Sequence, residues 1–279
     1  MQKIEKVAAM QEYAAALRRD GRRIALVPTL GALHAGHASL IRLARGKAAA
    51  IVSTFVNPLQ FGPSEDFARY PRTAAGDALL CEKEGAEVLF APAADEMFPR
   101  GFSTHVQEDA ISKPLCGVSR PTLFRGVLTC WLKLCNIVRP DLLVMGEKDL
   151  QQVAVVRKVA ADLLLPVEII TAPTVRDPDG LAVSARNTYL SPTQREEALA
   201  VHAALCRAKE MVEGGVKSAD RLVAEVTHLI AAKRRLRVIY ISIVDRQTME
   251  QLREIIPGGC LMAISFWVDE VRLTDNMPL

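Results

Sequence analysis

Two histidines three residues apart, His34 and His37, are the side chains of this sequence best suited to carry chemistry. They follow Arg23–Pro28, an apolar run that predicts a buried strand, and they precede a helical stretch that begins at Ala38. At this spacing both imidazoles lie on one face of a helix N-terminus, beside backbone N–H groups that have no partner in the helix. Such a terminus, placed after a strand of a parallel sheet, favours phosphate. The pattern therefore predicts a nucleotide site.

Gly31 and Gly36 strengthen this prediction, because they remove side chains where a nucleotide must approach the backbone closely. Imidazole N–H groups there would donate to triphosphate oxygens as negative charge moves during phosphoryl chemistry. Two other interpretations stay open, a purely structural histidine pair and a pair of metal ligands. The metal is the weaker of these, since the remaining histidines are scattered and form no second pair of ligands.

The segment Gly146–Asp149 is a second candidate, because it directly follows another predicted apolar strand. Active sites of open α/β sheets gather at the carboxyl ends of the strands. Lys148 supplies a mobile positive charge for phosphate. Asp149 either takes part in catalysis or caps the helix that follows. Gln151 and Gln152 open that helix, and an exposed helical face is the alternative to a role for either.

Two further loops carry polar side chains that suit a small anionic substrate. Gln60, in the loop 57–61, offers both a donor and an acceptor to a substrate with carboxylate and hydroxyl groups. The run Asp177–Gly180 predicts a turn, and Ser184 and Arg186 beside it offer a hydroxyl and a guanidinium for phosphate. Taken singly, each loop is equally well an ordinary surface loop.

The elements that must position these residues alternate along the chain as strands and helices. Strands without alternating polarity, separated by helices, indicate a parallel sheet covered on both faces. We therefore predict the α/β class, with a doubly wound, Rossmann-like parallel sheet. The predicted strands span residues 23–28, 49–56, 87–92, 141–145 and 166–171, and the predicted helices span residues 38–44, 77–84, 126–138 and 151–164.

The pattern changes after about Pro173. Two long helical stretches, residues 191–214 and 218–233, are followed by residues 237–244 and 260–273, which alternate as antiparallel strands do. This change predicts a second, smaller α+β domain. We place the domains at residues 1–175 and 176–279.

Composition narrows the class of protein further. The chain has 279 residues, of which 50% are hydrophobic and 5% aromatic, and its net charge is +3. A chain this apolar can bury enough surface to offset the conformational entropy that it loses on folding, which rules out general disorder. Its small net charge and few aromatic residues argue against a nucleic-acid binder. The six cysteines form no CxxC pair, which fits a reducing compartment. The first residues do not have the pattern of a signal peptide, and no apolar run reaches the length of a membrane span, so we expect a cytoplasmic enzyme.

A larger set of motifs, which includes the segments above, is distributed over nearly the whole chain. Its members are residues 28–37 (PTLGALHAGH), 55–61 (FVNPLQF), 70–73 (YPRT), 120–127 (RPTLFRGV), 136–141 (NIVRPD), 146–152 (GEKDLQQ), 176–190 and 271–276 (VRLTDN). In this order the motifs resemble the pantothenate synthetase (pantoate–β-alanine ligase) family. That family belongs to the nucleotidyltransferase superfamily, in which the HxGH motif embraces ATP and which is related to class I aminoacyl-tRNA synthetases.

The resemblance implies a ligase that works in two steps. ATP and pantoate first give pantoyl adenylate and pyrophosphate, with Mg²⁺, and the amine of β-alanine then attacks the adenylate to release pantothenate and AMP. It also implies that residues 1–175 bind ATP and pantoate and that residues 176–279 form a lid. The expected assembly is a homodimer with small-molecule substrates and with neither nucleic acid nor membrane as a partner.

The resemblance also assigns roles to individual side chains, with His37 as the proton donor. The catalytic residues it implies are His34, His37, Lys148 and Arg186. The residues it places around the substrates are Gln60, Gln152 and Arg120. The residues it places around ATP are Leu30, Gly31, His34, Gly36, His37, Gly146, Glu147, Lys148, Asp149, Val175, Val183, Ser184 and Arg186. It assigns no metal ligands.

The sequence departs from the family at a few of these positions. Leu123 stands where a histidine is usual, and Ala185 stands where a serine is usual, so two polar groups are missing and neither residue inherits a role. Leu30 and Val183 replace methionines but keep apolar bulk. We hypothesise an active ligase with slower turnover. The alternatives are a divergent paralogue that binds nucleotide or pantoate without turnover, and a tRNA-binding protein, against which the small net charge argues.

Overall fold

A computed structural model describes all residues, 1–279, and its internal contacts divide the chain into two compact units. Each unit gathers segments that are distant in sequence. The first unit comprises Met1–Glu108, Thr122–Glu147 and Val155–Pro173, and the second comprises Asp109–Pro121, Lys148–Ala154 and Thr174–Leu279. The domain boundary that the sequence predicts, after residue 175, lies close to Thr174, where the longest segment of the second unit starts. The roles assigned to the two domains stay predictions.

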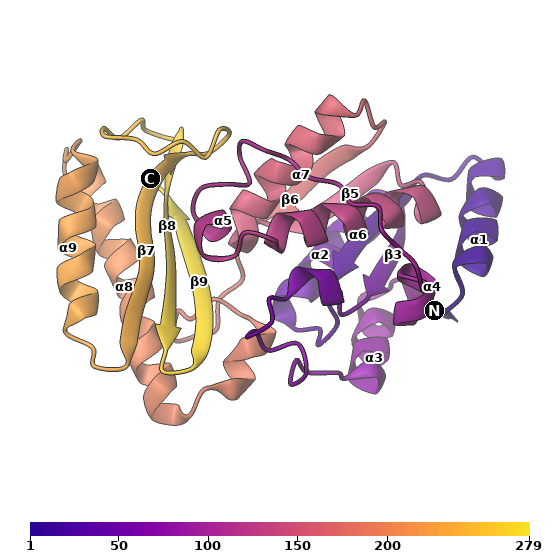
Figure 1. Cartoon of the computed structure of the whole chain (residues 1–279), viewed down its shortest axis with the longest axis horizontal. Coiled ribbons are helices and arrows are strands. Elements are labelled where there is room, and N and C mark those ends of the chain that lie inside the picture. Colours follow the sequence, from indigo (N-terminus) through magenta and orange to yellow (C-terminus); the bar gives the residue numbers. More distant parts are fainter. The chain divides into compact units, whose positions relative to one another are not determined.

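The first unit is built on a parallel sheet with the strand order β1-β4-β3-β2-β5-β6. Figure 1 labels β3, β5 and β6 of this sheet. All neighbouring strands run parallel. The central strands are buried and consist mostly of aliphatic residues, which explains why their sequences show no alternation of polarity. The strands are β1 (Gln2–Ile4), β2 (Ile24–Thr29), β3 (Ala49–Thr54), β4 (Val88–Phe90), β5 (Leu142–Gly146) and β6 (Glu168–Ala172).

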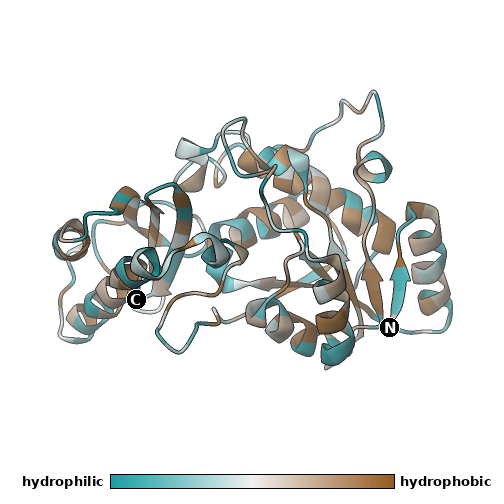
Figure 2. Cartoon of the chain, turned by 90° about the horizontal axis from the view of Figure 1, so that it is seen from below, coloured by the Kyte–Doolittle hydropathy of each residue, from teal (hydrophilic) through white to brown (hydrophobic).

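Helices connect these strands and bury their apolar stripes against the sheet. Leu40, Ile41 and Ala44 of α2 pack with residues of β2, β3 and β5 in one continuous core. Figure 2 shows both hydrophobic and hydrophilic residues along the helices, as expected for helices with one buried face. The helices are α1 (Val7–Arg19), α2 (Ala35–Arg45), α3 (Ala74–Glu84), α4 (Ala94–Met97), α6 (Leu123–Val138) and α7 (Leu150–Asp162), of which α7 begins in the second unit and continues in the first.

The second unit contains a three-stranded antiparallel sheet of order β7-β8-β9 (Figure 1). Two long helices cover one face of this sheet, and their buried residues form a separate core with residues such as Met262, Ile264 and Phe266. A four-residue helix, α5 (Cys116–Ser119), belongs to the same unit. The remaining elements are α8 (Pro192–Glu213), α9 (Ala219–Ala231), β7 (Leu236–Asp245), β8 (Cys260–Val268) and β9 (Val271–Pro278).

The predicted fold class is confirmed, with a parallel sheet and a smaller antiparallel sheet. Each predicted strand and helix is present within a few residues of its expected bounds, and residues 260–273 divide into two strands at the turn Asp269–Glu270. Among the elements that the sequence pattern did not predict are β1, α1 and the short helices α4 and α5. No helix combines the length and the apolar character that crossing a bilayer requires.

The six cysteines are all free thiols, and they differ in burial. Burial raises the pKa of Cys81, Cys130 and Cys135 to about 12 each, and Cys260 is also buried. A thiol reacts with a disulfide reagent only when it is ionised and when the reagent can reach it. We therefore expect Ellman's reagent at pH 8 to modify only the half-buried Cys116 and Cys206 quickly in the folded protein. All six should react after denaturation, and fast modification of all six before denaturation would contradict this burial.

Candidate active site

The carboxyl ends of the central strands of the first unit hold several of the predicted site residues. β2 lies between β3 and β5, and the chain leaves it toward β3 first and returns to β5 much later, so the strand order reverses here. In open α/β sheets this switch point is where ligands bind. Thr29, at the end of β2, pairs with Thr54 and donates to the carbonyl of Ser53 at 2.7 Å, so the loops after β2 and β3 start side by side.

The two predicted histidines lie at the start of α2, the helix that follows β2. His34 is the residue before the helix, and its backbone N–H donates to His37 Nδ1 at 3.2 Å. The two rings are 4.0 Å apart between centroids. Because Nδ1 of His37 accepts a hydrogen bond, the neutral ring carries its proton on Nε2, which makes Nε2 a donor. The arrangement suits donation to an anionic oxygen.

Gly36 leaves room for the His34 ring. A Cβ atom at this position would lie 3.1 Å from both Cε1 and Nδ1 of His34. At that distance the His34 ring would have to shift by a few tenths of an ångström to admit a side chain. Two reasons therefore favour glycine at position 36. The sequence predicts that it leaves space for a nucleotide, and the structure shows that it leaves space for the His34 ring.

A buried carboxylate fixes the loop that carries the histidines. Asp77 on α3 is only 4% exposed and accepts from the backbone N–H groups of Ala32 at 3.1 Å and Leu33 at 2.8 Å. It also accepts from the hydroxyl of Thr73 at 2.9 Å. Ala32 has a φ of +49°, a conformation that costs about 1 kcal/mol or more and persists only where neighbours hold it. The sequence pattern placed Asp77 at a helix start and gave it no role in the site.

We expect Asp77→Asn to lower the free energy of unfolding by about 2–3 kcal/mol, because an amide NH₂ cannot accept both backbone N–H groups and one donor is left buried. Urea denaturation measures this change. Asp162→Asn is the matched control, since Asp162 pairs with Lys158 at the surface and its loss should cost less than about 1 kcal/mol. Equal stability of the two variants would show that Asp77 does not hold the loop.

The loop after β3 presents Gln60 from a short 3-10 turn, Pro58–Gln60. Asn57 is 1% exposed and bonds in two directions, accepting from the Leu59 N–H at 3.1 Å and donating to the carbonyl of Gly126 at 3.0 Å. A Cβ atom on Gly126 would lie 2.0 Å from the Leu59 carbonyl oxygen. The loop therefore rests directly on the backbone of α6, and only glycine permits this contact.

The same edge of the sheet holds the first half of the Gly146–Asp149 motif. Gly146 ends β5 and pairs with Ala172 of β6. The Glu147 carboxylate accepts from the hydroxyl of Thr171 at 3.0 Å, which fixes its side chain beside the end of β6. Leu30, Gly31, His34, Gly36, His37, Gly146 and Glu147 thus lie at or directly after neighbouring strand ends of the first unit. Leu123, the first residue of α6, is buried.

The second unit carries the remaining predicted residues, beginning with Lys148. Its Nζ lies 3.6 Å from the Asp149 carboxylate and 3.5 Å from the hydroxyl of Thr274, and its side chain is 22% exposed. Asn276 donates to the backbone carbonyl of Lys148 at 2.8 Å. A free lysine side chain is flexible, and these contacts are what restrict the position of the Lys148 ammonium.

The predicted phosphate loop folds as a short hairpin. Val183 N–H donates to the carbonyl of Val175 at 3.0 Å, which brings these two predicted residues together. The Ser184 hydroxyl accepts from the Arg186 N–H at 3.3 Å, at the start of the 3-10 turn Ala185–Tyr189. Ser184 therefore has a capping role that coexists with any contact to phosphate. Ala185 is buried in this turn, which fits its small apolar side chain.

Gln151, for which the sequence left open a role or an exposed helical face, is buried. Its amide nitrogen donates to the carbonyls of Ile111 at 3.1 Å and Pro114 at 2.7 Å, and its amide oxygen accepts from the Cys116 N–H at 3.1 Å. These bonds hold the segment 109–121, which ends near Arg120, to the start of α7. Gln152, next in sequence, is half-buried on the same turn. No sequence signal distinguishes the two glutamines.

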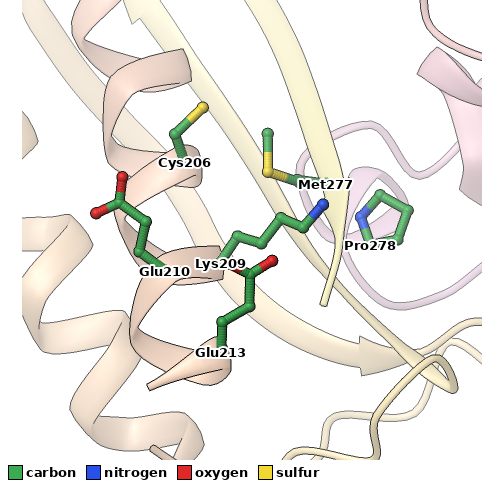
Figure 3. A pocket seen from close by; sticks show the side chains of 6 residues that line it. All are labelled: Cys206, Lys209, Glu210, Glu213, Met277 and Pro278. Carbon is green, nitrogen blue, oxygen red and sulfur yellow. The ribbon is translucent and has the colours of Figure 1, made fainter. Parts of the chain in front are cut away.

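A hollow of about 390 Å³ opens between α8 and the end of β9 (Figure 3). It is lined by Cys206, Lys209, Glu210, Glu213, Met277 and Pro278, none of which is a predicted site residue. Two carboxylates against one ammonium make this surface unsuited to a triphosphate. The candidate site residues thus lie elsewhere, at the strand ends of the first unit and, within the second unit, at Lys148 and the phosphate loop.

Comparisons with known proteins identify the family of the chain. The family model described as pantoate–β-alanine ligase matches residues 2–278. A pantothenate synthetase of Heliobacterium modesticaldum is 47% identical over 278 residues, which are 99% of each chain. A pantothenate synthetase of Moorella thermoacetica is 46% identical over 280 residues, which are 100% of this chain and 99% of the other.

Solved structures of pantothenate synthetases resemble the whole chain. A crystal structure of pantothenate synthetase from Thermus thermophilus superposes with a TM-score of 0.94 at 38% identity and 99% coverage of both chains. A pantoate–β-alanine ligase from Francisella tularensis, complexed with β-γ ATP and β-alanine, has a TM-score of 0.81 at 30% identity, and the match covers 100% of this chain and 97% of the other.

Proposed function

This chain belongs to the pantoate–β-alanine ligase family, and from that premise we propose that it condenses pantoate with β-alanine at the expense of ATP, through a pantoyl adenylate. The observation that carries the proposal is the His34–His37 pair at the start of α2, at the switch point of the parallel sheet. A carboxylate such as that of pantoate does not acylate amines, and adenylation provides it with a leaving group.

In the first step the pantoate carboxylate attacks the α-phosphorus of ATP, a P–O bond forms, and pyrophosphate leaves. Negative charge then accumulates on the departing oxygens. His37 donates from Nε2, and His34, Lys148 and Arg186 add donors or positive charge around the phosphates. Gly31, Gly36 and Gly146–Asp149 border the nucleotide, together with Leu30. Val175, Val183 and Ser184 close the loop over it.

In the second step the amine of β-alanine attacks the acyl carbon of the adenylate, an amide bond forms, and AMP leaves with the electron pair of the broken C–O bond. Gln60, Gln152 and Arg120 hold the two small substrates. Exclusion of water protects the adenylate from hydrolysis. We assign this protection to closure of residues 176–279, as a lid over residues 1–175.

Magnesium accompanies ATP in this proposal. No three His, Cys, Asp or Glu side chains of the chain gather as a metal cluster. Mg²⁺ is commonly bound through substrate phosphates and one or two carboxylates, so the ion enters with the nucleotide and no step is assigned to a protein-bound metal. We further propose a homodimer, supported by the family resemblance of the motifs, in the cytoplasm, where six free cysteines fit the reducing environment. Sedimentation of the purified protein measures the assembly.

The experiment that tests the function measures AMP release by the pure protein with magnesium and ATP. We expect release only when pantoate and β-alanine are both present. Exchange of labelled pyrophosphate into ATP, dependent on pantoate alone, isolates the first step. A folded protein that neither exchanges pyrophosphate nor releases AMP would refute the proposal.

The departure at Leu123 allows a test of the proposed slower turnover. Leu123 is the first residue of α6, where backbone N–H groups are free, and leucine donates no hydrogen bond. We expect Leu123→His to raise kcat by about tenfold, the effect of one hydrogen bond to a developing charge. Leu123→Met, which keeps apolar volume, is the control and should leave kcat unchanged. Equal kcat in both variants would mean that Leu123 does not limit the rate.

A further inference from the structure

The motif VRLTDN, known from the sequence only by resemblance, forms most of β9 and touches two predicted ATP-binding segments. Its last three residues are Thr274, Asp275 and Asn276. Successive side chains of a strand point to opposite faces, so Thr274 and Asn276 share one face and Asp275 lies on the other. Each face meets a different segment of the second unit.

On the first face, two residues of β9 contact Lys148. Asn276 is 8% exposed, and its amide nitrogen donates to the Lys148 backbone carbonyl at 2.8 Å. Thr274 places its hydroxyl 3.5 Å from Lys148 Nζ. The main chain and the ammonium of one lysine are thus both held by one strand. On the neighbouring strand β8, the small residues Ser265 and Ala263 pair with Thr274 and Asn276.

On the opposite face, Asp275 holds the phosphate loop. Its carboxylate is 7% exposed and accepts two hydrogen bonds from the Arg176 guanidinium, at 2.7 and 2.9 Å. Arg176 also donates to the carbonyl of Gly180 at 3.1 Å, and so closes the turn that precedes Val183 and Ser184. A bidentate arginine–carboxylate pair fixes orientation as well as distance.

The backbone of β9 does not need these polar side chains. Its hydrogen bonds to β8 involve main-chain groups, and Val271 and Leu273 supply the apolar residues that join the core. Thr274, Asp275 and Asn276 therefore serve the segments that they contact, which are Lys148 and the phosphate loop. A flexible lysine gains most from such support, because a displacement of about 1 Å can cost as much as a hundredfold in rate.

We propose that Asn276 is a positioning residue for adenylation, which acts by fixing the main chain of Lys148 and hence the position of the ammonium against the phosphates of ATP. Asp275 does the same for the phosphate loop through Arg176. This inference rests on the proposed function, because it takes Lys148 as a phosphate-binding residue.

The test is a double-mutant cycle on the full chain, with the dissociation constant of magnesium ATP measured by calorimetry as the readout. We expect Asn276→Ala to weaken ATP binding about tenfold and to lower pyrophosphate exchange at least as much, within the range that misplacement causes. In a Lys148→Ala background the same substitution should change ATP binding less than about twofold, because coupled residues are not additive. Met277→Leu is the control, since Met277 is next on β9 and lines the hollow of Figure 3.

The outcomes separate the inference from the function on which it rests. Equal losses from Asn276→Ala with and without Lys148 would show a merely structural role and overturn the inference alone. A folded wild-type protein that binds no ATP would remove both. If Asn276→Ala does not fold, Asn276→Leu repeats the cycle, since it keeps a similar side-chain volume without the donor.

Discussion

Pantoate-dependent exchange of pyrophosphate into ATP should fall about a thousandfold when His37 is replaced by alanine, the upper part of the range for a single donor to developing charge. His37 Nδ1 already accepts from the His34 N–H, so Nε2 is the donor that the phosphates lose. The affinity for pantoate should change much less than the rate, because the lost interaction strengthens as charge develops. Steady-state exchange at varied ATP and pantoate measures both quantities.

The control for this experiment is His228→Ala on the exposed side of α9, which removes an imidazole far along the chain from the site motifs. Its exchange rate should match that of the wild type. The unfolding midpoint of His228→Ala should match that of the wild type, whereas His37→Ala should lose about 1 kcal/mol of stability, because it removes the acceptor of the His34 N–H. If His37→Ala keeps more than about a tenth of the wild-type exchange, an oxyanion-type role for His37 is wrong.

Gly126→Ala should lower the free energy of unfolding by about 3 kcal/mol and raise the KM for pantoate. Alanine favours a helix over glycine by about 1 kcal/mol, so on propensity alone the change would stabilise α6. The added Cβ would lie 2.0 Å from the Leu59 carbonyl oxygen and 2.9 Å from the Gln60 nitrogen, however, and backbone atoms cannot yield as a side chain can. The steric cost wins and moves the loop that carries Gln60.

Chemical denaturation and steady-state kinetics together test this result. Gly76→Ala in the first turn of α3 is the matched control, because its Cβ would meet Thr73 at an ordinary 3.9 Å. We expect it to be neutral or slightly stabilising. A Gly126→Ala protein as stable as the Gly76→Ala protein would show that the loop can move away from α6 without loss.

The parallel sheet was predictable because its strands are buried on both faces and separated by turn residues, as in Ala49–Thr54 before Asn57. β1 was missed for a physical reason, since its three residues, QKI, lie at an edge of the sheet and include two exposed polar side chains. α1 was missed because only Met10, Ala14 and Leu17 of its residues are buried. Such a stripe is narrow beside the polar remainder of the helix.

In the candidate site, the sequence pattern pointed to the groups that we propose face a ligand, and it missed the groups that hold their loops. His34 and His37 carry a spacing that has a chemical meaning, whereas Asp77 bonds to backbone N–H groups 44 and 45 residues earlier in the chain. Gln151 and Gln152 are identical neighbours whose burial differs only because a distant segment folds against one of them. Contacts of this kind depend on the tertiary fold and leave no periodic signal.

The contact between Lys148 and β9 has a consequence for the order in which the protein matures. Thr274 and Asn276 of β9 follow Lys148 by 126 and 128 residues, so the ribosome makes them long after the lysine. The parallel strands can pair while the chain is still growing, since all of them precede residue 173. A nascent chain at that stage has its histidines but no fixed lysine. Competence to bind ATP should therefore arise abruptly and only after β9 has been made and has paired with β8.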